Sequence, residues 1–414
     1  MTSWLGTLKA AVLSVVVCVC LLSVRVDAQN PQENAQLKEV RITAGAFSLS
    51  DPVPAWVELV AIPEASQAYP IVLRLADTQY YVDGTPIVYV RRALLVNDAA
   101  SLSSAGQISI PFVPEYNQLK LHAVRVHRNG QSLDRTQSSN VRFLQRETGL
   151  EQGVYSGEVT ASILISDLRV GDTLEFAYSL HGQNPVFGGK FIETASWDQA
   201  SPTTLRRVVL NHRVGRQVSW RVIGDRKSKP VVPTEVVRGE IRRLVFEERS
   251  IGKFDPEPST PRDYPSFRRM QFSEFTGWDD VVAWARGLFQ RQGEFSQDLR
   301  EVIEKLRERP TDEDRAVGAL EFVQSEIRYF SVSLGESSHR PTQPDVVVKQ
   351  RYGDCKDKSL LLMTLLEALG IESKPVLVAT GMRRGLDLML PSPELFNHAI
   401  VVARRPLQRI VNSV

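Results

Sequence analysis

Cysteine is scarce in this 414-residue sequence, which contains three. Cys18 and Cys20 lie in an apolar run from Ala10 to Val24, so the rest of the chain holds one thiol, that of Cys355. Beyond the apolar run, no disulfide framework can stabilise the fold. A chain of this length can bury enough surface to fold without one.

The apolar run is too short for a typical membrane span. Its residues would form about 22 Å of helix, less than the roughly 30 Å of a bilayer's hydrocarbon core. Lys9 precedes the run, and Val26-Asp27-Ala28 has the small-residue spacing of a signal peptidase site. The sequence therefore predicts a signal peptide over residues 1–28, cleaved after Ala28. We expect a periplasmic or secreted protein with no stable membrane span after cleavage.

A strong charge of either sign is also lacking. The formal net charge is +2, and it falls to +1 when Lys9, Arg25 and Asp27 leave with the signal peptide. This balance gives no electrostatic reason to expect nucleic acid or an anionic membrane as a partner. Charged residues make up 24% and hydrophobic residues 43% of the chain, which is typical of a globular protein.

Several catalytic and metal-binding signatures are absent from the sequence. It has no His-Glu-x-x-His, no Cys-x-x-Cys and no Gly-x-Ser-x-Gly pattern. Gly188-Gly189-Lys190 resembles part of a phosphate-binding loop, but Phe191 stands where such a loop needs serine or threonine. We interpret this segment as a turn, and we expect neither a metal ion nor a cofactor.

Short β-branched or aromatic runs, separated by turn residues, extend from about residue 40 to 250. Asp83-Gly84 and Asn129-Gly130 are typical of two-residue hairpin turns. We therefore predict an antiparallel β-sandwich over residues 29–253. A proline-rich stretch over 254–267 suits neither ladder nor helix, and we interpret it as a linker. The strand runs are 71–75, 87–90, 119–126, 174–178 and 218–222.

Beyond the linker the apolar period becomes that of helices, which we predict over 278–289 and 311–329, with Thr311 as an N-cap. A third helix starts at Cys355 and ends at Gly370, a residue suited to a left-handed cap. Residues 375–379 and 399–402 are typical of buried strands. The fold class is thus α+β and multidomain, with an α+β core over 268–414.

Cys355 lies in the run Gly353 to Lys358, at the start of the third predicted helix. The structural alternative is a small buried apolar residue. The charged neighbours instead favour a partly exposed, electropositive thiol. We expect Asp354 to cap the helix, and Lys356, Asp357 and Lys358 to form either part of the site or a solvated first turn. Arg351 and Tyr352 are candidates to line an acyl pocket.

His398 opens an apolar strand downstream of Cys355. A helix N-terminus contributes only roughly 0.3 to 1 kcal/mol, whereas lowering a thiol pKa by one unit requires about 1.4 kcal/mol. A histidinium partner could supply the remainder and could later protonate a leaving amine. Cys355 and His398 are therefore the candidate nucleophile and general base. His339, in the loop before the cysteine helix, is a spare base candidate.

Two sets of motifs carry a resemblance to known families. The segments Gly353 to Ser359, Ile327-Arg328-Tyr329 and Asn397-His398-Ala399 resemble the bacterial transglutaminase-like superfamily, whose core is papain-like. Three further segments resemble the uncharacterised β-sandwich domain that often precedes this core in exported bacterial proteins. These segments are 124–130, 167–172 and 184–189.

The resemblance implies that Cys355 is the nucleophile and that His398 is the general base and acid. It also implies an aspartate on the next strand, in a Trp-x-Asp-Pro context, but no Asp or Glu follows Glu394. Arg404 to Arg409 does not have the pattern of the expected strand pair. We therefore expect the core to be incomplete at its C-terminus, through truncation, a frameshift or genuine loss, and the enzyme to be impaired. Asn397 could orient a group locally, but should face away from His398.

Two functions remain open from the sequence. The first is an exported thiol enzyme that attacks amide bonds of protein or peptide substrates, including cell-envelope proteins, with water or a lysine amine as acceptor. The second is a non-catalytic envelope binding or scaffold protein that uses the β-sandwich.

Overall fold

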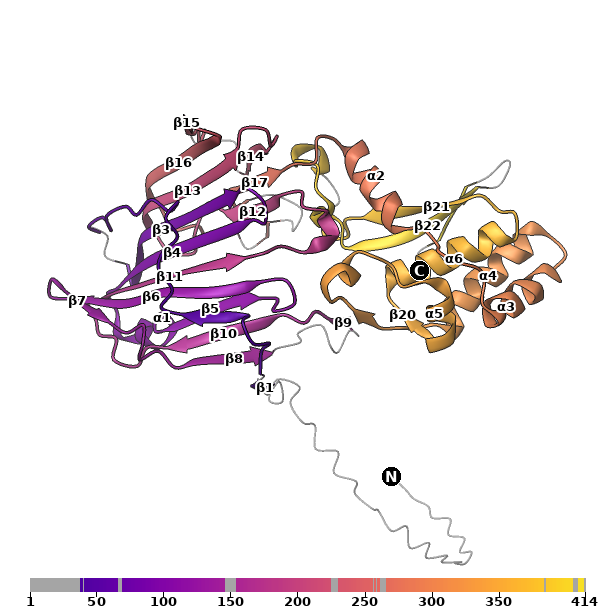
Figure 1. Ribbon diagram of the computed structural model, residues 1–414, viewed down its shortest axis with the longest axis horizontal. Coiled ribbons are helices and arrows are strands. Elements are labelled where there is room, and N and C mark those ends of the chain that lie inside the picture. The colour runs from indigo at the N-terminus through magenta and orange to yellow at the C-terminus, as the bar shows by residue number, and fades with distance from the viewer. Residues whose placement is uncertain are drawn as a thin grey trace, which may run out of the picture. The chain divides into compact units, whose positions relative to one another are not determined.

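In the computed structural model of this chain (Figure 1), strands form the region up to about residue 273, and helices dominate the remainder. The structure describes residues 38–39, 41–65, 69–145, 154–224, 230–255, 257, 259–260, 266–382, 385–404 and 409–412. The expected signal peptide and part of the expected linker lie outside the described residues. No described helix has the length and apolar character needed to cross a bilayer.

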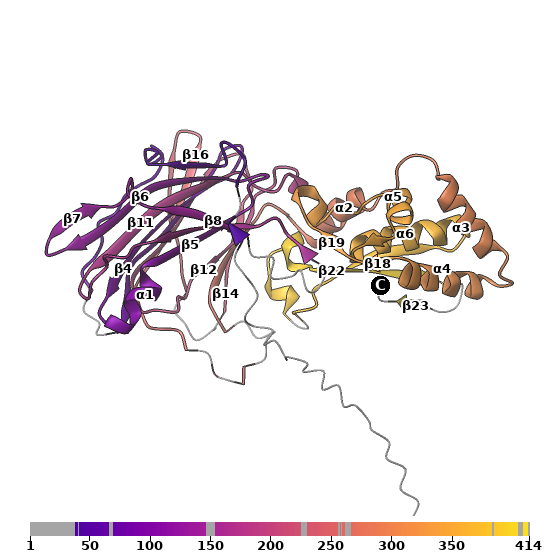
Figure 2. The same cartoon turned by 90° about the horizontal axis from the view of Figure 1, so that it is seen from below.

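The strand region contains one large sheet and two smaller ones, which Figure 2 shows from below. The large sheet has the order β15-β16-β13-β3-β4-β11-β6-β2, with β7 paired to β6. Its strands are β2 (Phe47–Leu49), β3 (Ile71–Val82), β4 (Ile87–Val96), β6 (Gln118–Arg128), β7 (Gln131–Asp134), β11 (Thr173–His181), β13 (Thr203–Arg213), β15 (Thr234–Arg238) and β16 (Ile241–Ile251).

The smaller sheets cover the large one through two separate apolar cores. The sheet β1-β8-β10-β5 packs on one end of the large sheet through residues such as Ile110, Leu121 and Ile163, all nearly fully buried. The sheet β12-β17-β14 packs on the other end around Trp197 and Phe246. These strands are β1 (Lys38–Glu39), β5 (Gln107–Phe112), β8 (Val141–Gln145), β10 (Val159–Leu164), β12 (Ile192–Ser196), β14 (Ser219–Ile223) and β17 (Arg269–Ser273). A short η1 (Ala99–Ser101) and α1 (Leu102–Ala105) connect β4 to β5.

The fold class predicted from the sequence is confirmed, with differences of detail. Most strand pairs are antiparallel, but β13 pairs with β3, and β2 with β6, in parallel. Asn129-Gly130 forms the expected two-residue hairpin, with φ of 49° and 75°. Asp83-Gly84 instead belongs to a longer connection, because β3 ends at Val82 and β4 begins at Ile87.

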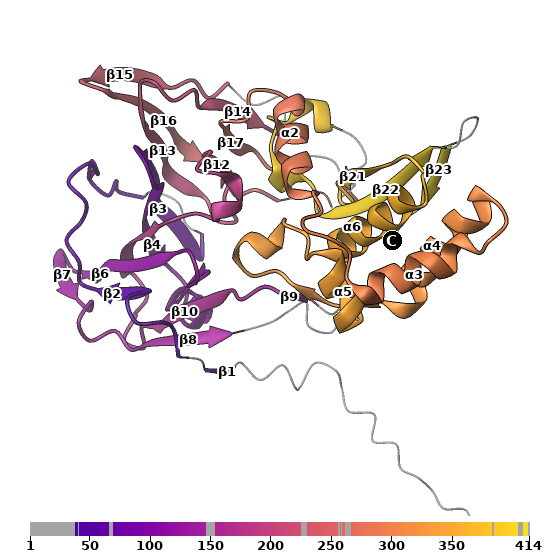
Figure 3. The same ribbon diagram turned by 45° about the vertical axis from the view of Figure 1, so that its right-hand side comes forward.

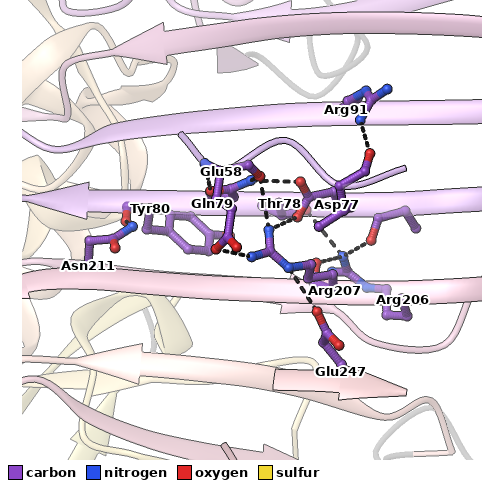
Figure 4. Close-up of polar contacts among 12 residues, drawn as sticks. Glu58, Asp77, Thr78, Gln79, Tyr80, Arg91, Arg206, Arg207, Asn211 and Glu247 are labelled. Carbon is purple, nitrogen blue, oxygen red and sulfur yellow. Dashed lines mark hydrogen bonds and ion pairs between the residues drawn. The ribbon is translucent and has the colours of Figure 1, made fainter. Parts of the chain in front are cut away.

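Two neighbouring arginines of β13 are almost fully buried, and Figure 4 shows their contacts. Arg207 binds Glu247 (Nε to Oε1, 3.0 Å), Glu58 (Nη2 to Oε2, 3.0 Å) and the buried Asp77 (Nη1 to Oδ1, 3.3 Å). Arg206 donates mainly to backbone carbonyls, including that of Ala76 at 2.9 Å. Each buried charge therefore has its donors or acceptors filled, as burial in a sheet core requires.

The second half of the chain packs helices around a central one, α6 (Cys355–Ala368). Figure 3 shows α6 between the small yellow sheet and the orange helices. Leu361, Leu365 and Leu366 of α6 are buried in the core that these elements share. The surrounding helices are α2 (Trp278–Leu288), α3 (Gln297–Arg307), α4 (Asp312–Glu326) and α5 (Pro344–Gln350).

The small sheet has the order β21-β22-β23, so β21 lies at its edge. It consists of β21 (Ser373–Val378), β22 (His398–Arg404) and β23 (Arg409–Asn412). We expected no strand pair after Arg404, and this expectation is wrong, because β23 pairs antiparallel with β22. The short β-branched pair Ile410-Val411 is sufficient for a strand when β22 is available as its template.

The two halves of the chain share short elements. β9 (Val154–Tyr155) of the first half pairs with β19 (Ser331–Val332) of the second. Within the second half, β18 (Arg328–Tyr329) pairs with β20 (Tyr352–Gly353). Four 3-10 turns complete this region: η3 (Pro185–Phe187), η4 (Gly335–Ser338), η5 (Leu386–Leu388) and η6 (Pro393–Leu395). Gly188 ends η3 with φ of 61°, so the Gly-Gly-Lys segment is the turn that we predicted.

Candidate functional site

The cysteine helix starts where its sequence provides a reciprocal cap. The Asp354 carboxylate accepts hydrogen bonds from the backbone N–H of Lys356 at 3.1 Å and of Asp357 at 3.3 Å. In return, Asp357 accepts from the Asp354 N–H at 3.1 Å. A Cβ added at Gly353 would lie 2.8 Å from the Asp357 Cβ, so glycine is required before the cap. This capping box fixes Cys355 as the first residue of α6.

The first turn of α6 is buried, so the solvated first turn that we considered is wrong. Lys356, Asp357 and Lys358 have only 6 to 7% of their surface exposed. The Lys356 ammonium forms an ion pair with the Asp354 carboxylate. Lys358 donates to the Ile327 carbonyl at 3.1 Å. The sequence alone could not show that this turn is buried, because elements from elsewhere in the chain cover it.

His398 comes to the same cavity as Cys355 from the sheet. It opens β22 opposite Val378 of β21, and the next residue, Ala399, brings its backbone N–H close to the Cys355 sulfur. Cys355 and His398 both line one pocket of about 190 Å³, which we call the thiol pocket. Within the described residues, no hydrogen bond joins the two side chains directly, but the fold places them on the same cavity.

The surroundings of Cys355 do not favour its thiolate, contrary to our expectation of an electropositive site. Burial first, and then the charge of Asp354, raise the thiol pKa above its usual value. The Ala399 N–H and the Lys356 ammonium act in the opposite direction but do not cancel these effects. Asp354 is needed as a helix cap, and its carboxylate therefore lies beside the sulfur. These surroundings favour the neutral thiol over the thiolate.

The remaining sequence candidates take different places. Asn397 lines the thiol pocket, but its amide oxygen accepts from the Thr380 N–H at 2.9 Å, which directs it away from the His398 ring. Tyr352 packs edge-to-face on Phe330, with ring centroids 5.7 Å apart. Arg351 ends α5 with φ of 59° and pairs with Glu326. Neither Tyr352 nor Arg351 is among the residues that line the pocket.

The segment from Asn184 to Gly189, far away in sequence, contributes to the wall around the thiol pocket. The Asn184 amide donates to the Gly335 carbonyl at 2.9 Å and to the Ser338 hydroxyl at 2.8 Å. The Trp284 indole N–H donates to the Val186 carbonyl at 2.8 Å. The sequence marked 184–189 as a motif but did not connect it to the site. The residues that Asn184 contacts lie about 150 positions away in the sequence.

His339 lies in this wall and also lines the thiol pocket. Its ring packs edge-to-face against Phe187 and Trp284, with centroids 5.2 Å and 5.6 Å away. Burial, with a contribution from the Lys356 charge, lowers the pKa of His339 to about 4. Such a low pKa makes His339 a weak base at neutral pH.

A larger apolar pocket of about 900 Å³, which we call the apolar groove, adjoins the thiol pocket. The two share Phe289, Leu377 and Phe396 in their walls. One side of the groove is α2, including the exposed Val282, and the other is the edge strand β21, whose residues 373–377 all line it. An edge strand beside an apolar channel suits an extended peptide.

No group of three His, Cys, Asp or Glu side chains in the described part of the chain could hold a metal ion. The side chains that line the thiol pocket include the Cys355 thiol and the imidazoles of His339 and His398.

Comparison with known proteins finds one family match in each half of the chain. Residues 82–254 match DUF3857, a domain of unknown function, and residues 300–389 match the transglutaminase-like superfamily. The first match contains Asn184 to Gly189 and the second contains Cys355, whereas His398 lies beyond it. No curated protein sequence matches this chain.

Among solved structures, a candidate protease from Parabacteroides distasonis ATCC 8503 is similar with a TM-score of 0.68 and 15% identity, covering 83% of this chain and 67% of that one. At this identity the likeness shows the fold alone. Weaker similarities are with a candidate cysteine protease from Cytophaga hutchinsonii (TM-score 0.24, 14% identity, 54% of this chain and 75% of that one). The periplasmic domain of TgpA from Pseudomonas aeruginosa is also similar (TM-score 0.23, 12% identity, 70% and 86%).

Proposed function

We propose that this member of the transglutaminase-like superfamily, with its DUF3857 region, is an exported thiol enzyme that cleaves or exchanges amide bonds of peptides. One observation carries the proposal: Cys355, at the start of α6, and His398, at the start of β22, share one pocket. A thiol and an imidazole at the same cavity are the minimum set for acyl transfer from an amide.

The raised thiol pKa determines how the proton moves. The neutral Cys355 thiol attacks the amide carbon. The His398 ring takes the thiol proton as the S–C bond forms, so no free thiolate precedes the attack. The same proton then passes to the leaving amine as the C–N bond breaks. Water or a second amine attacks the thioester carbon in turn, gives its proton to His398, and Cys355 leaves as a thiol.

The apolar groove supports a peptide as the acyl donor. It continues from the thiol pocket along β21, where an extended chain could pair with the strand edge and place apolar side chains against α2. Export rests on the sequence features of residues 1–28, and we propose a periplasmic or secreted location on that ground.

The test uses the full chain with a library of apolar peptide amides as acyl donors and the fluorescent amine monodansylcadaverine as an acyl acceptor. Wild type should release amine from the peptides or attach the fluorescent amine to them. Cys355→Ala and His398→Ala should each lose activity by about 10³-fold or more, with unchanged melting temperatures. Ser337→Ala, an exposed neighbour outside the pocket lining, should retain it.

Equal activity in wild type and Cys355→Ala would sink the proposal. If the wild type releases no amine and transfers none, the non-catalytic binding or scaffold function becomes the better account.

A further inference from the structure

We infer that strand β21 binds the acyl-donor peptide as an added strand, and that Pro375 is a specificity-determining residue because it leaves one carbonyl of that peptide unpaired. The inference rests on the proposed function and deepens it, since it names the backbone groups that recognise the substrate. Among the described strands, β21 pairs only with β22, so its other edge is free.

The register between β21 and β22 shows which backbone groups of β21 lie on the free edge. The Val378 carbonyl points to β22, where it accepts from the Asn397 N–H at 3.1 Å. In an antiparallel pair, successive residues point their backbone groups alternately to the partner and away from it. Every second residue counted back from Val378 therefore faces β22, and the residues between them face the free edge. These outward-facing residues are Ser373, Pro375 and Leu377.

Ala399 of β22 agrees with this register. It stands opposite Leu377, and its N–H is close to the Cys355 sulfur, so this N–H does not point to β21. Leu377 and Ala399 thus form a pair without mutual hydrogen bonds. The N–H and the carbonyl of Leu377 remain available to a third chain.

The free edge offers unequal groups to such a chain. Leu377 and Ser373 each present one N–H and one carbonyl, whereas Pro375 between them presents a carbonyl alone. An antiparallel peptide therefore forms two hydrogen bonds at Leu377, two at Ser373 and one at Pro375, and its carbonyl opposite Pro375 finds no donor on this strand. Proline here costs the sheet no hydrogen bond, because its nitrogen faces away from β22.

The position of the edge beside the thiol pocket favours the acyl donor as its occupant. Residues 373–377 line the apolar groove, and Leu377 also lines the thiol pocket. A peptide paired with the edge at Leu377 therefore leads toward Cys355. Val376 of β21 and Val282 of α2 are both exposed in the groove and give the peptide's side chains apolar contacts.

The charges in the groove add a second requirement. Its charged lining residues are Arg286 and Lys374, and both are cationic. Lys374 has an ion pair with Glu372 at 3.4 Å, whereas no carboxylate in the described part of the chain pairs with Arg286. We therefore expect an apolar peptide with one acidic side chain to match the groove better than a basic peptide does.

The experiment measures binding by the full chain with Cys355→Ala, which cannot transfer an acyl group. The probe is acetyl-Leu-Ala-Leu-Ala-Leu-Glu-amide. When this peptide is bound, amide hydrogen exchange at Leu377 and Ser373 should slow about tenfold or more. Exchange at Val376, whose N–H already faces β22, should change less than about twofold.

A variant with the missing donor tests the role of the proline. Pro375→Ala adds an N–H on the free edge and should raise affinity for the peptide about fivefold, the effect of one hydrogen bond. Replacing the peptide carbonyls one at a time by thioamides, which accept hydrogen bonds more weakly, should find one position that matters only in Pro375→Ala. Pro111→Ala is the matched control and should change neither result, because Pro111 is an exposed proline on the edge strand β5 of another sheet.

The remaining outcomes decide against the inference. Lysine in place of the peptide's glutamate should lower affinity about threefold, and Arg286→Gln should remove this preference. Absence of binding, or binding without slower exchange at Leu377, would overturn the added strand, and so would slow exchange at Leu377 before peptide is added, which would show that another copy of the chain occupies the edge. Unchanged affinity in Pro375→Ala would overturn the role of the proline. Turnover of peptide amides by the wild type is measured separately, so a failed edge and a failed enzyme give different results.

Discussion

Cys355 combines the geometry of a nucleophile with surroundings that keep its thiol protonated. Its helix start favours an anion by less than one pKa unit, while burial and the adjacent Asp354 carboxylate act against it. The balance differs from a resting thiolate–imidazolium pair, in which the thiolate would persist well below pH 7. Under the proposed function, His398 takes the thiol proton as Cys355 attacks.

We predict that alkylation by iodoacetamide will rise with pH up to at least 9. Because burial and the charge of Asp354 raise the thiol pKa, the thiolate should remain the minor form at neutral pH, and the rate should keep rising as the pH increases. Stopped-flow or mass-spectrometric rates would measure this, with urea-unfolded chain as the control. A plateau that starts below pH 7 would instead indicate a preformed ion pair.

The chemistry of single residues could be predicted from the sequence better than their surroundings. Cys355 and His398 stood out by residue type and position, and Asp354 by its place before a helix. The burial of Lys356 and Lys358 could not be anticipated, because it depends on elements from elsewhere in the chain. The same holds for the contact of Asn184 with Ser338, which no local pattern encodes.

At the scale of elements, α2 and β21 form the two sides of the apolar groove. Val282 of α2 is 54% exposed and Val376 of β21 is 37% exposed, so apolar surface remains for a substrate to cover. The helical period predicted α2 as an amphipathic helix with a core face. The sequence pattern placed Val282 on this apolar face, but the structure leaves its side chain exposed, and only the position of β21 shows what it faces.

We predict that Val282→Asp will raise KM for apolar peptide amides about tenfold, with little change in kcat. A carboxylate in the groove would have to lose water when the peptide binds, which costs affinity, about 1.4 kcal/mol for each factor of ten. Val317→Asp is the matched control, because Val317 is also an exposed helical valine, 42% exposed on α4, outside the groove. Steady-state kinetics would decide, and equal effects of both changes would exclude the groove as a peptide site.

At the scale of the whole molecule, the strand region holds the loop that leads to His398. Arg221 of β14 donates to the Leu388 carbonyl at 2.8 Å, and Ser273 of β17 donates to the Pro391 carbonyl at 2.5 Å. Glu394 in the same loop lies close enough to Glu193 of β12 for its negative charge to raise the pKa of Glu193. Burial, and then the charge of the exposed Glu394, raise the pKa of Glu193 to about 7.

The Glu193 carboxyl couples folding to pH. A carboxyl whose pKa is higher in the folded chain binds protons more strongly when folded, so its contribution to stability is greatest below about pH 4.5 and is lost as pH rises toward 7. Above pH 7 both carry charge, and their repulsion acts between β12 and the loop before His398. A neutral residue at position 193 removes this cost.

We therefore predict that Glu193→Gln will stabilise the chain at pH 8 by about 1 kcal/mol, a value reduced for partial exposure of the carboxyl, and will leave stability at pH 4.5 nearly unchanged. Urea unfolding at both pH values measures the difference. Glu367→Gln, on the exposed side of α6, is the control and should show no pH-dependent gain. A loss of stability at pH 8 would mean that the Glu193 carboxylate makes a favourable contact that outweighs its repulsion by Glu394.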